Sequence, residues 1–323
     1  MKKANTVWRH AVEDEFCGPY LEVVGERVIF TLTRGGQYAL RAIDSTGRQV
    51  WEQQWPEMSG LFRTGAGHVY TGGDQARCIS VETGAVTAER HLGDEVDVYI
   101  AEPSSVVYRT GKGMVGLHPE NLSTLWEWPD EEGAFVPDHG RVCRYSLTDG
   151  ITIVDVASKA ERTIMPERQL SPSAVHAHCG DVWCHFDLTE GHRTGIDLNS
   201  GLVVWHESQP VGYGLITVDG ERAYSPLEGL AAYDLRTGRQ LWHQRLPIVS
   251  RAFIWNGRAY VGGYEGWTPI IFVVDGATGE LLLKHKVDFK LTGLGHEPSP
   301  VVAMGDDRII VGMRRAILCL ELS

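Results

Sequence analysis

The sequence lacks most of the features that identify a membrane-spanning or disulfide-stabilised protein. No run of apolar residues reaches the roughly 18 needed to span a bilayer, and no apolar segment follows Lys2 and Lys3 to form a secretion signal. The six cysteines are scattered, with no adjacent pair and no Cys-x-x-Cys, which fits neither a disulfide framework nor a zinc ribbon. We therefore expect a cytoplasmic chain with reduced, mostly buried thiols and no membrane partner.

Positive charge is also scarce. The 323 residues contain 30 Lys and Arg against 42 Asp and Glu, which gives a formal net charge of -12. Because nucleic acids and anionic membranes are bound mainly through clustered Lys and Arg, the sequence disfavours both as partners. The 43% of hydrophobic residues are enough for a sizeable core and too many for a disordered chain.

What the sequence does contain is an internal repeat. Its clearest copies, residues 41–51, 195–205 and 231–242, each have two strand-like segments joined by a Thr-Gly or Ser-Gly corner and end in tryptophan. Successive corners are 37 to 42 residues apart, which is typical of a β-propeller built from four-stranded blades. The corner positions are Gly47, Gly84, Leu122, Lys159, Gly201, Gly238 and Gly279.

A second, independent pattern gives the number of blades. Two residues after each of eight turns stands an uncharged and often aromatic residue, as a strand buried between stacked sheets requires. These residues are Ile29, Tyr70, Tyr108, Cys143, Trp183, Tyr224, Tyr260 and Ile310. The last repeat lacks its outer strand, and residues 6–12, which include Trp8, have the pattern of that strand.

The sequence thus predicts an all-β, eight-bladed propeller of four-stranded antiparallel blades. We expect it to form one domain over residues 1–323, closed by pairing of the N-terminal strand with the C-terminal blade.

The pattern Ala-x-Asp-x-x-Thr-Gly-x-x-x-Trp resembles the PQQ-like propeller repeat family. That family includes eight-bladed quinoprotein alcohol dehydrogenases and the outer-membrane assembly propeller BamB. The resemblance implies that the tryptophan and the corner are structural and indicate no activity. Quinoprotein dehydrogenases are far longer, carry a disulfide of adjacent cysteines and bind calcium, and BamB relatives carry a lipoprotein signal. Because this sequence has neither adjacent cysteines nor that signal, we expect that the protein is not a PQQ-dependent dehydrogenase and binds no cofactor. The alternative, in which the propeller retains a quinone or calcium at its centre, stays open.

Long intervals in the repeat suggest where a partner binds. The turn spacing is 35 to 41 residues except for the last interval, which is 50, with the extra residues in 262–269 and 288–300. Residues 187–194 suggest another extended loop. Insertions that crowd one face of a repeat protein usually build its binding face. The candidate binding residues combine aromatic area with charge: His192, Arg193, Tyr264, Glu265, Trp267, His296 and Glu297.

These features favour a protein-binding module, either a scaffold or an immunity- or inhibitor-type partner, that acts through its loop-rich face. A partner with a basic surface would complement the acidic chain. The alternative is a cofactor-independent lyase, cyclase or hydrolase, with a small molecule bound at the mouth of a central channel. Its candidate bases, acids and anion clamp are His176, His296, Tyr20, Tyr99, Tyr213 and Arg251.

Residues 176–185 contain three histidines and two cysteines, which are residue types that bind zinc. Because side chains of a β-strand alternate between its two faces, at most two or three of them could converge. The sequence therefore predicts no metal site.

Overall fold

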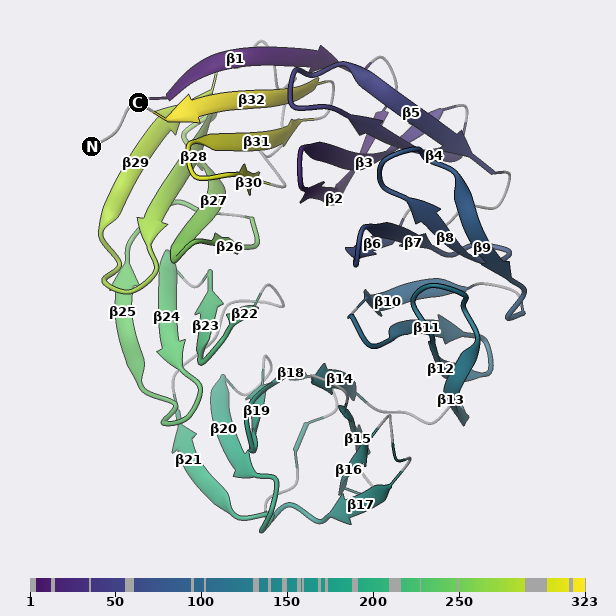
Figure 1. Cartoon of the computed structure of the whole chain (residues 1–323). Helices are drawn as coiled ribbons and strands as arrows, with labels where there is room; N and C mark the ends of the chain where they lie inside the picture. The colour runs from purple at the N-terminus through teal and green to yellow at the C-terminus, as the bar shows by residue number, and fades with distance from the viewer. Residues whose placement is uncertain are drawn as a thin grey trace. The chain divides into compact units, whose positions relative to one another are not determined.

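A computed structural model of the chain describes most of the sequence. The described residues are 4–12, 15–34, 36–55, 61–93, 96–101, 103–129, 134–138, 141–146, 150–155, 158, 160–167, 170–171, 174–187, 191–208, 216–226, 228–248, 250–287, 301–313 and 316–322. They form 32 strands in eight four-stranded sheets, which confirms the predicted eight-bladed β-propeller (Figure 1). No helix in this part of the chain has the length and hydropathy of a membrane span.

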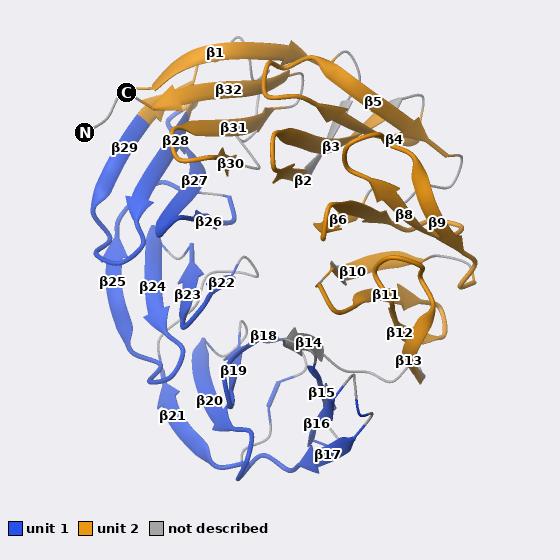
Figure 2. Ribbon diagram, viewed as in Figure 1, with its two compact units in different colours: residues 1, 131–266, 270–284 blue, residues 2–130, 267–269, 285–323 orange. Residues whose placement is uncertain are grey.

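The chain divides into two compact units, shown in different colours in Figure 2. One unit comprises residues 131–266 and 270–284, and the other comprises residues 2–130, 267–269 and 285–323. The single domain expected from the sequence stays a prediction.

The unit that contains residues 2–130, which is unit 2 in Figure 2, holds four blades. Blade 1 consists of β2 (Glu15–Val24), β3 (Arg27–Arg34), β4 (Gln37–Ile43) and β5 (Gln49–Gln54). Blade 2 consists of β6 (Phe62–Gly65), β7 (His68–Thr71), β8 (Ala76–Ser80) and β9 (Val86–Arg90). Blade 3 consists of β10 (Asp97–Ala101), β11 (Val106–Thr110), β12 (Gly113–Leu117) and β13 (Thr124–Pro129). Blade 8 consists of β30 (Val301–Met304), β31 (Arg308–Met313), β32 (Ala316–Leu322) and β1 (Ala4–Ala11).

The other four blades belong mainly to unit 1 of Figure 2. Blade 4 consists of β14 (Ala134–Asp138), β15 (Arg141–Ser146), β16 (Gly150–Asp155) and β17 (Glu161–Ile164). Blade 5 consists of β18 (Ala174–Cys179), β19 (Val182–Asp187), β20 (His192–Asp197) and β21 (Val203–Glu207). Blade 6 consists of β22 (Thr217–Asp219), β23 (Arg222–Ser225), β24 (Leu230–Asp234) and β25 (Gln240–Gln244). Blade 7 consists of β26 (Phe253–Trp255), β27 (Arg258–Glu265), β28 (Thr268–Asp275) and β29 (Leu281–Lys286).

The two ends of the chain pair as predicted. Strand β1 lies antiparallel to β32, from Ala4 opposite Leu322 to Ala11 opposite Ala316. The N-terminal segment thereby supplies the fourth strand of blade 8 and covers the edge of β32 that would otherwise be open.

The eight residues that follow the turns, from which the number of blades was predicted, are buried in all eight blades. None of them is more than 1% exposed: Ile29, Tyr70, Tyr108, Cys143, Trp183, Tyr224, Tyr260 and Ile310. The five cysteines whose side chains the structure describes are buried and form no disulfide.

In blades 1, 4, 5, 6 and 7 the corner is held by an aspartate. In blade 1, Asp44 Oδ1 accepts hydrogen bonds from the Thr46 amide at 2.9 Å and from the Thr46 hydroxyl at 2.6 Å. The hydrogen bond from the Thr46 hydroxyl holds the pKa of Asp44 below its usual value. The Ser200 hydroxyl does the same for the pKa of Asp197, and the Thr278 amide does so for the pKa of Asp275.

The repeat tryptophan of one blade docks onto the corner of the next. In blade 5, Trp205 Nε1 donates a hydrogen bond to the Leu235 carbonyl at 3.0 Å, and its ring covers Gly238. A Cβ at Gly238 would lie 2.4 Å from this ring, and Gly238 has φ of 71°, so a residue with a side chain would meet both a clash and backbone strain there. The same docking joins Trp8 to Gly47, Trp51 to Gly84 and Trp242 to Gly279.

We expect Gly238→Ala to destabilise the chain by about 2–4 kcal/mol, because it combines left-handed backbone strain with displacement of the Trp205 ring. Gly220→Ala in the same blade is the matched control: Gly220 also has positive φ, but its Cβ would meet open space. That variant should lose only about 1 kcal/mol. Urea unfolding measures both, and equal losses would show that the indole contact contributes nothing.

The corner aspartates also predict how stability depends on pH. Since folding lowers their pKa values, their contribution is present above the ordinary aspartate pKa and is lost as the pH falls through the lowered values. A triple variant, Asp44→Asn with Asp197→Asn and Asp275→Asn, should therefore lose less stability than the wild type between about pH 5 and about pH 3. Urea midpoints measured across this range test the prediction, with Asp219→Asn as a control outside the corners; parallel curves would contradict it.

Candidate functional site

The candidate binding residues Tyr264, Glu265 and Trp267 lie in one hairpin of blade 7. The sequence predicts an inserted loop at 262–269, and this prediction is wrong, because most residues of this segment belong to β27 and β28, which are eight residues long each. The turn between the two strands is Gly266 and Trp267. The elaboration is therefore a long hairpin with a short tip. The second expected insertion, 288–300, lies outside the described residues.

The hairpin is fixed to the segment that enters blade 7. Gly263 forms an isolated bridge with Ile248, and a Cβ at Gly263 would lie 1.9 Å from the Pro247 carbonyl oxygen. Only glycine allows this approach. The Gly262 amide donates to Ser250 Oγ at 2.7 Å, and the Tyr264 amide donates to the Pro247 carbonyl at 3.0 Å. The hairpin backbone is thus anchored up to the residue before Glu265.

The tip presents an indole next to charged residues. Trp267 is 80% exposed, the largest exposed fraction among the large apolar side chains that the structure describes. Two residues earlier in the chain, Glu265 Oε1 accepts a hydrogen bond from Lys284 Nζ at 2.9 Å, and both side chains of this ion pair are accessible. An exposed tryptophan at a rigid position is characteristic of protein-binding sites.

The other described binding candidates, His192 and Arg193, are not on a loop. Both belong to strand β20, which pairs with β19 so that His192 stands opposite Asp187. The Arg193 side chain is 1% exposed, and its guanidinium carbon lies 3.8 Å from the centre of the Tyr233 ring. Burial lowers the pKa of Arg193, while the neighbouring Tyr233 and Glu207 raise it. Arg193 therefore packs within unit 1 and offers no contact surface to a partner.

The catalytic candidate His176 is in β18 and packs among aromatic rings. Its ring centre lies 5.0 Å from that of His185, 5.1 Å from Trp183 and 5.6 Å from Tyr145. Burial, with a smaller contribution from His185, lowers the pKa of His176 to about 3. A base acts best when its pKa is near the working pH, so this histidine is neutral and weakly basic at pH 7.

The remaining catalytic candidates have structural contacts or lie outside the described residues. Arg251 Nε donates to Thr217 Oγ1 at 3.1 Å, the Tyr99 carbonyl accepts a hydrogen bond from Arg63 Nε at 3.2 Å, and Tyr20 packs against the core of blades 1 and 2. Tyr20 and Tyr99 belong to one compact unit, whereas His176 and Arg251 belong to the other. The candidates outside the described residues are Tyr213, His296 and Glu297. A catalytic site at a channel mouth stays a prediction.

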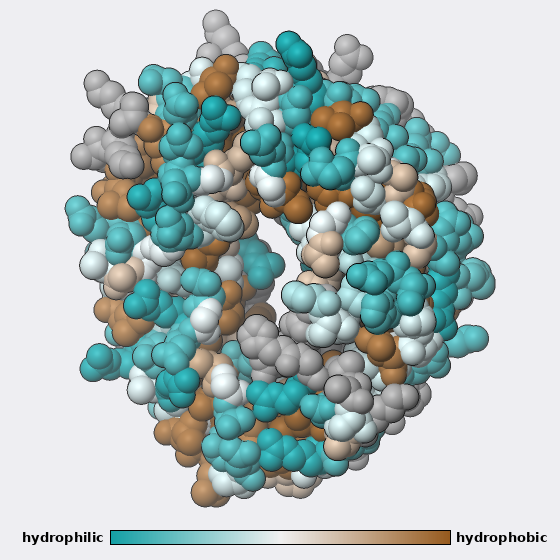
Figure 3. All heavy atoms as spheres, viewed as in Figure 1, coloured by the Kyte–Doolittle hydropathy of each residue, from teal (hydrophilic) through white to brown (hydrophobic). Residues whose placement is uncertain are grey.

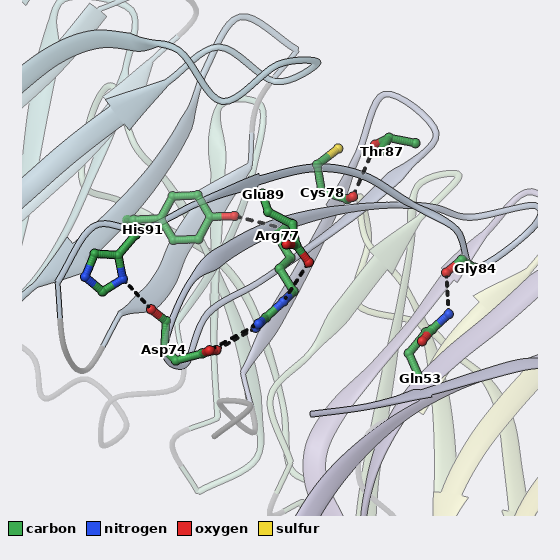
Figure 4. Close-up of polar contacts among 9 residues, drawn as sticks. Gln53, Asp74, Arg77, Cys78, Gly84, Thr87, Glu89 and His91 are labelled. Atoms are coloured by element: carbon green, nitrogen blue, oxygen red, sulfur yellow. Dashed lines mark hydrogen bonds and ion pairs between the residues drawn. The ribbon is translucent and has the colours of Figure 1, made fainter. Parts of the chain in front are cut away.

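Sequence reasoning missed the buried arginines of the third strands. Arg77 of β8 is 4% exposed and forms ion pairs with Asp74 at 2.8 Å and with Glu89 at 3.3 Å (Figure 4). In blade 1, Arg41 of β4 pairs with Glu52 at 2.7 Å. The sequence contains a signal for these pairs. Each arginine stands three residues before the residue that begins the corner, Asp44 or Ser80, and lies opposite a glutamate of the fourth strand. These pairs satisfy buried charge, and we regard them as structural.

The comparisons with known proteins agree with this architecture. The family model described as outer membrane protein assembly factor BamB matches residues 2–207 and 189–320. The chain belongs to this family. No curated protein matches the sequence significantly.

Solved structures show the same fold at low sequence identity. The chain is similar to BamB from Moraxella catarrhalis, with 12% identity over 99% of this chain and 98% of that one and a TM-score of 0.63. It is similar to the computationally designed protein Ika8, with 14% identity over 98% and 99% of the two chains and a TM-score of 0.70. Saccharomyces cerevisiae Sqt1 matches with 12% identity over 98% of each chain and a TM-score of 0.64. At these identities the likeness extends to the fold alone.

Proposed function

We propose that the chain is a non-catalytic protein-binding module that contacts its partner through the tip of the β27–β28 hairpin. The observation that carries this proposal is the exposure of Trp267 at the end of an anchored hairpin. Tryptophan is among the residues most enriched at the energetic centres of interfaces, because it buries a large area and loses little side-chain entropy. Membership of a family named for an assembly factor supports a binding role.

The charged residues near Trp267 favour recognition over nonspecific association. Glu265, two residues earlier in the chain, and its partner Lys284 are both accessible, and the face of the molecule drawn in Figure 3 is mostly hydrophilic, with apolar residues in separate patches. An aromatic anchor beside charged residues resembles the core and rim of a transient interface. Because the hairpin backbone is already anchored, little ordering free energy would oppose binding.

The charge of the chain suggests the chemistry of the partner. With a net charge of -12, the chain favours a partner that carries a basic surface, and such complementarity accelerates association. Glu265 at the tip could exchange Lys284 for a basic side chain of the partner. A scaffold and an immunity- or inhibitor-type protein would both work in this way, and the cytoplasmic location belongs to the same proposal.

A photo-crosslinking amino acid at position 267 tests the proposal directly in cells of the native host. We expect one dominant crosslinked protein with a basic surface. The matched control carries the same amino acid at position 255, where Trp255 is 47% exposed and precedes the turn at the other end of β27. Equal crosslinking at both positions, or none at position 267, would contradict the proposed surface.

With the crosslinked partner purified, Trp267→Ala should weaken binding by about 30-fold, the loss typical of an interface hot spot of about 2 kcal/mol. Trp255→Ala should leave the dissociation constant within about twofold. Isothermal titration at two salt concentrations measures both effects, and affinity should fall as salt rises. A tryptophan-independent interaction would place the binding surface elsewhere.

A further inference from the structure

Blade 5 contains a cluster of metal-ligating side chains that is separate from the hairpin tip. His185 and Asp187 are two residues apart on β19 and therefore share one face of the sheet. His192 of β20 stands opposite Asp187 and joins them on that face. His185 is 0% exposed, Asp187 is 2% exposed, and the side chain of His192 is 12% exposed. Their potential ligand atoms all lie within 4.8 Å of one another.

The distances within this cluster suit an ion better than direct hydrogen bonds. Asp187 Oδ2 lies 4.0 Å from His185 Nε2 and 3.9 Å from His192 Nε2. Two ligand atoms bound to one zinc at about 2.1 Å each are separated by at most about 4.2 Å. Both distances are within this limit and exceed hydrogen-bond length. If each imidazole rotated so that its distance to Asp187 became about half an ångström shorter, the ligand atoms would have the separation of a tetrahedral zinc site.

The hydrogen bonding of His185 shows the protonation state of its Nε2 atom. The Ser171 amide donates to His185 Nε2 at 3.3 Å, so this nitrogen carries a lone pair and not a proton, and a bound metal ion would replace this long hydrogen bond. The lone pair and the carboxylate of Asp187 are two electron-rich groups on the same buried face. A cation between them would contact both groups.

Two further histidines extend the cluster in both directions. The ring of His206 lies 5.2 Å from that of His192, and the residue is exposed, so the cluster has an access route from solvent. At the inner end, the ring of His176 lies 5.0 Å from that of His185. Both ring nitrogens of His176 are buried and have no hydrogen-bond partner among the described residues. His176 could thus supply a fourth nitrogen ligand.

We propose that blade 5 binds one divalent transition-metal ion, zinc by its ligand chemistry, through His185, Asp187 and His192. Two imidazoles with one carboxylate form a recognised zinc ligand set. The sequence predicts no metal site because Cys184 and His185 alternate, and Cys184 does lie on the opposite face, among residues that pack toward blade 6. The third ligand instead comes from His192, on the next strand.

Zinc binding by the untagged full-length chain tests the proposal. After treatment with a chelator and reloading, we expect one zinc per chain to remain through gel filtration. His192→Gln should weaken zinc binding by about 100-fold in calorimetric titration. His243→Gln is the matched control, since His243 is an exposed histidine on β25 of blade 6. It should leave the affinity within about twofold.

Cobalt keeps the test decisive if a variant folds poorly. Co²⁺ added to the wild-type chain should give the visible absorption bands of a four- or five-coordinate nitrogen and oxygen site, and Asp187→Asn should change these bands. Less than about 0.2 zinc per wild-type chain would overturn the proposal and leave an imidazole–carboxylate contact without metal. Equal loss of affinity in His192→Gln and His243→Gln would also overturn it, because it would indicate adventitious binding to surface histidines.

Discussion

Docking of an outer-strand tryptophan onto a corner glycine is the contact on which the rest of the fold depends. A single blade cannot bury its own apolar faces, so each needs a neighbour at a fixed distance and angle. The pair Trp205 and Gly238 fixes both, since the indole donates to a corner carbonyl and occupies the space of the missing side chain. Corner aspartates such as Asp234 hold the acceptor loop by hydrogen bonds from Thr237.

This constraint explains why the fold could be predicted from sequence and the details of the site could not. Two positions show how far the repeat predicts the structure. Leu122 has positive φ at a corner that lacks glycine, as its place in the repeat requires. The N-terminal strand that includes Trp8 pairs with the C-terminal blade. Such positions recur every 40 residues or so, so several copies of the repeat indicate the role of each. The partner of Gly263 is Ile248, a contact that only the folded chain reveals. The repeat therefore distinguishes an insertion from the standard unit but does not show whether it forms a loop or a longer strand.

The histidine cluster lies where the docking contact is absent. Blade 4 has Thr163 in the position of the repeat tryptophan, and its fourth strand reaches Gly201 of blade 5 through Ile164. Without an indole, the interior between these blades is filled by other groups, among them Tyr145 and Trp183. Polar side chains are accommodated there because neutral imidazoles pack against aromatic rings at low desolvation cost. The absence of the repeat tryptophan from blade 4 thus leaves space for polar side chains that the docked indole would otherwise exclude.

The same reasoning separates the two proposed sites. The hairpin departs from most of the repeats by extending both β27 and β28 to eight residues, and Trp267 at its tip is exposed. The cluster departs from it in the interior, where strand register brings His192 to Asp187 across only four intervening residues. The sequence predicts an extended loop over residues 187–194 that includes His192, whereas this residue belongs to β20 and lies opposite Asp187 of β19. A surface contact and a buried ligand set make different demands on the scaffold, so either can be lost without loss of the other.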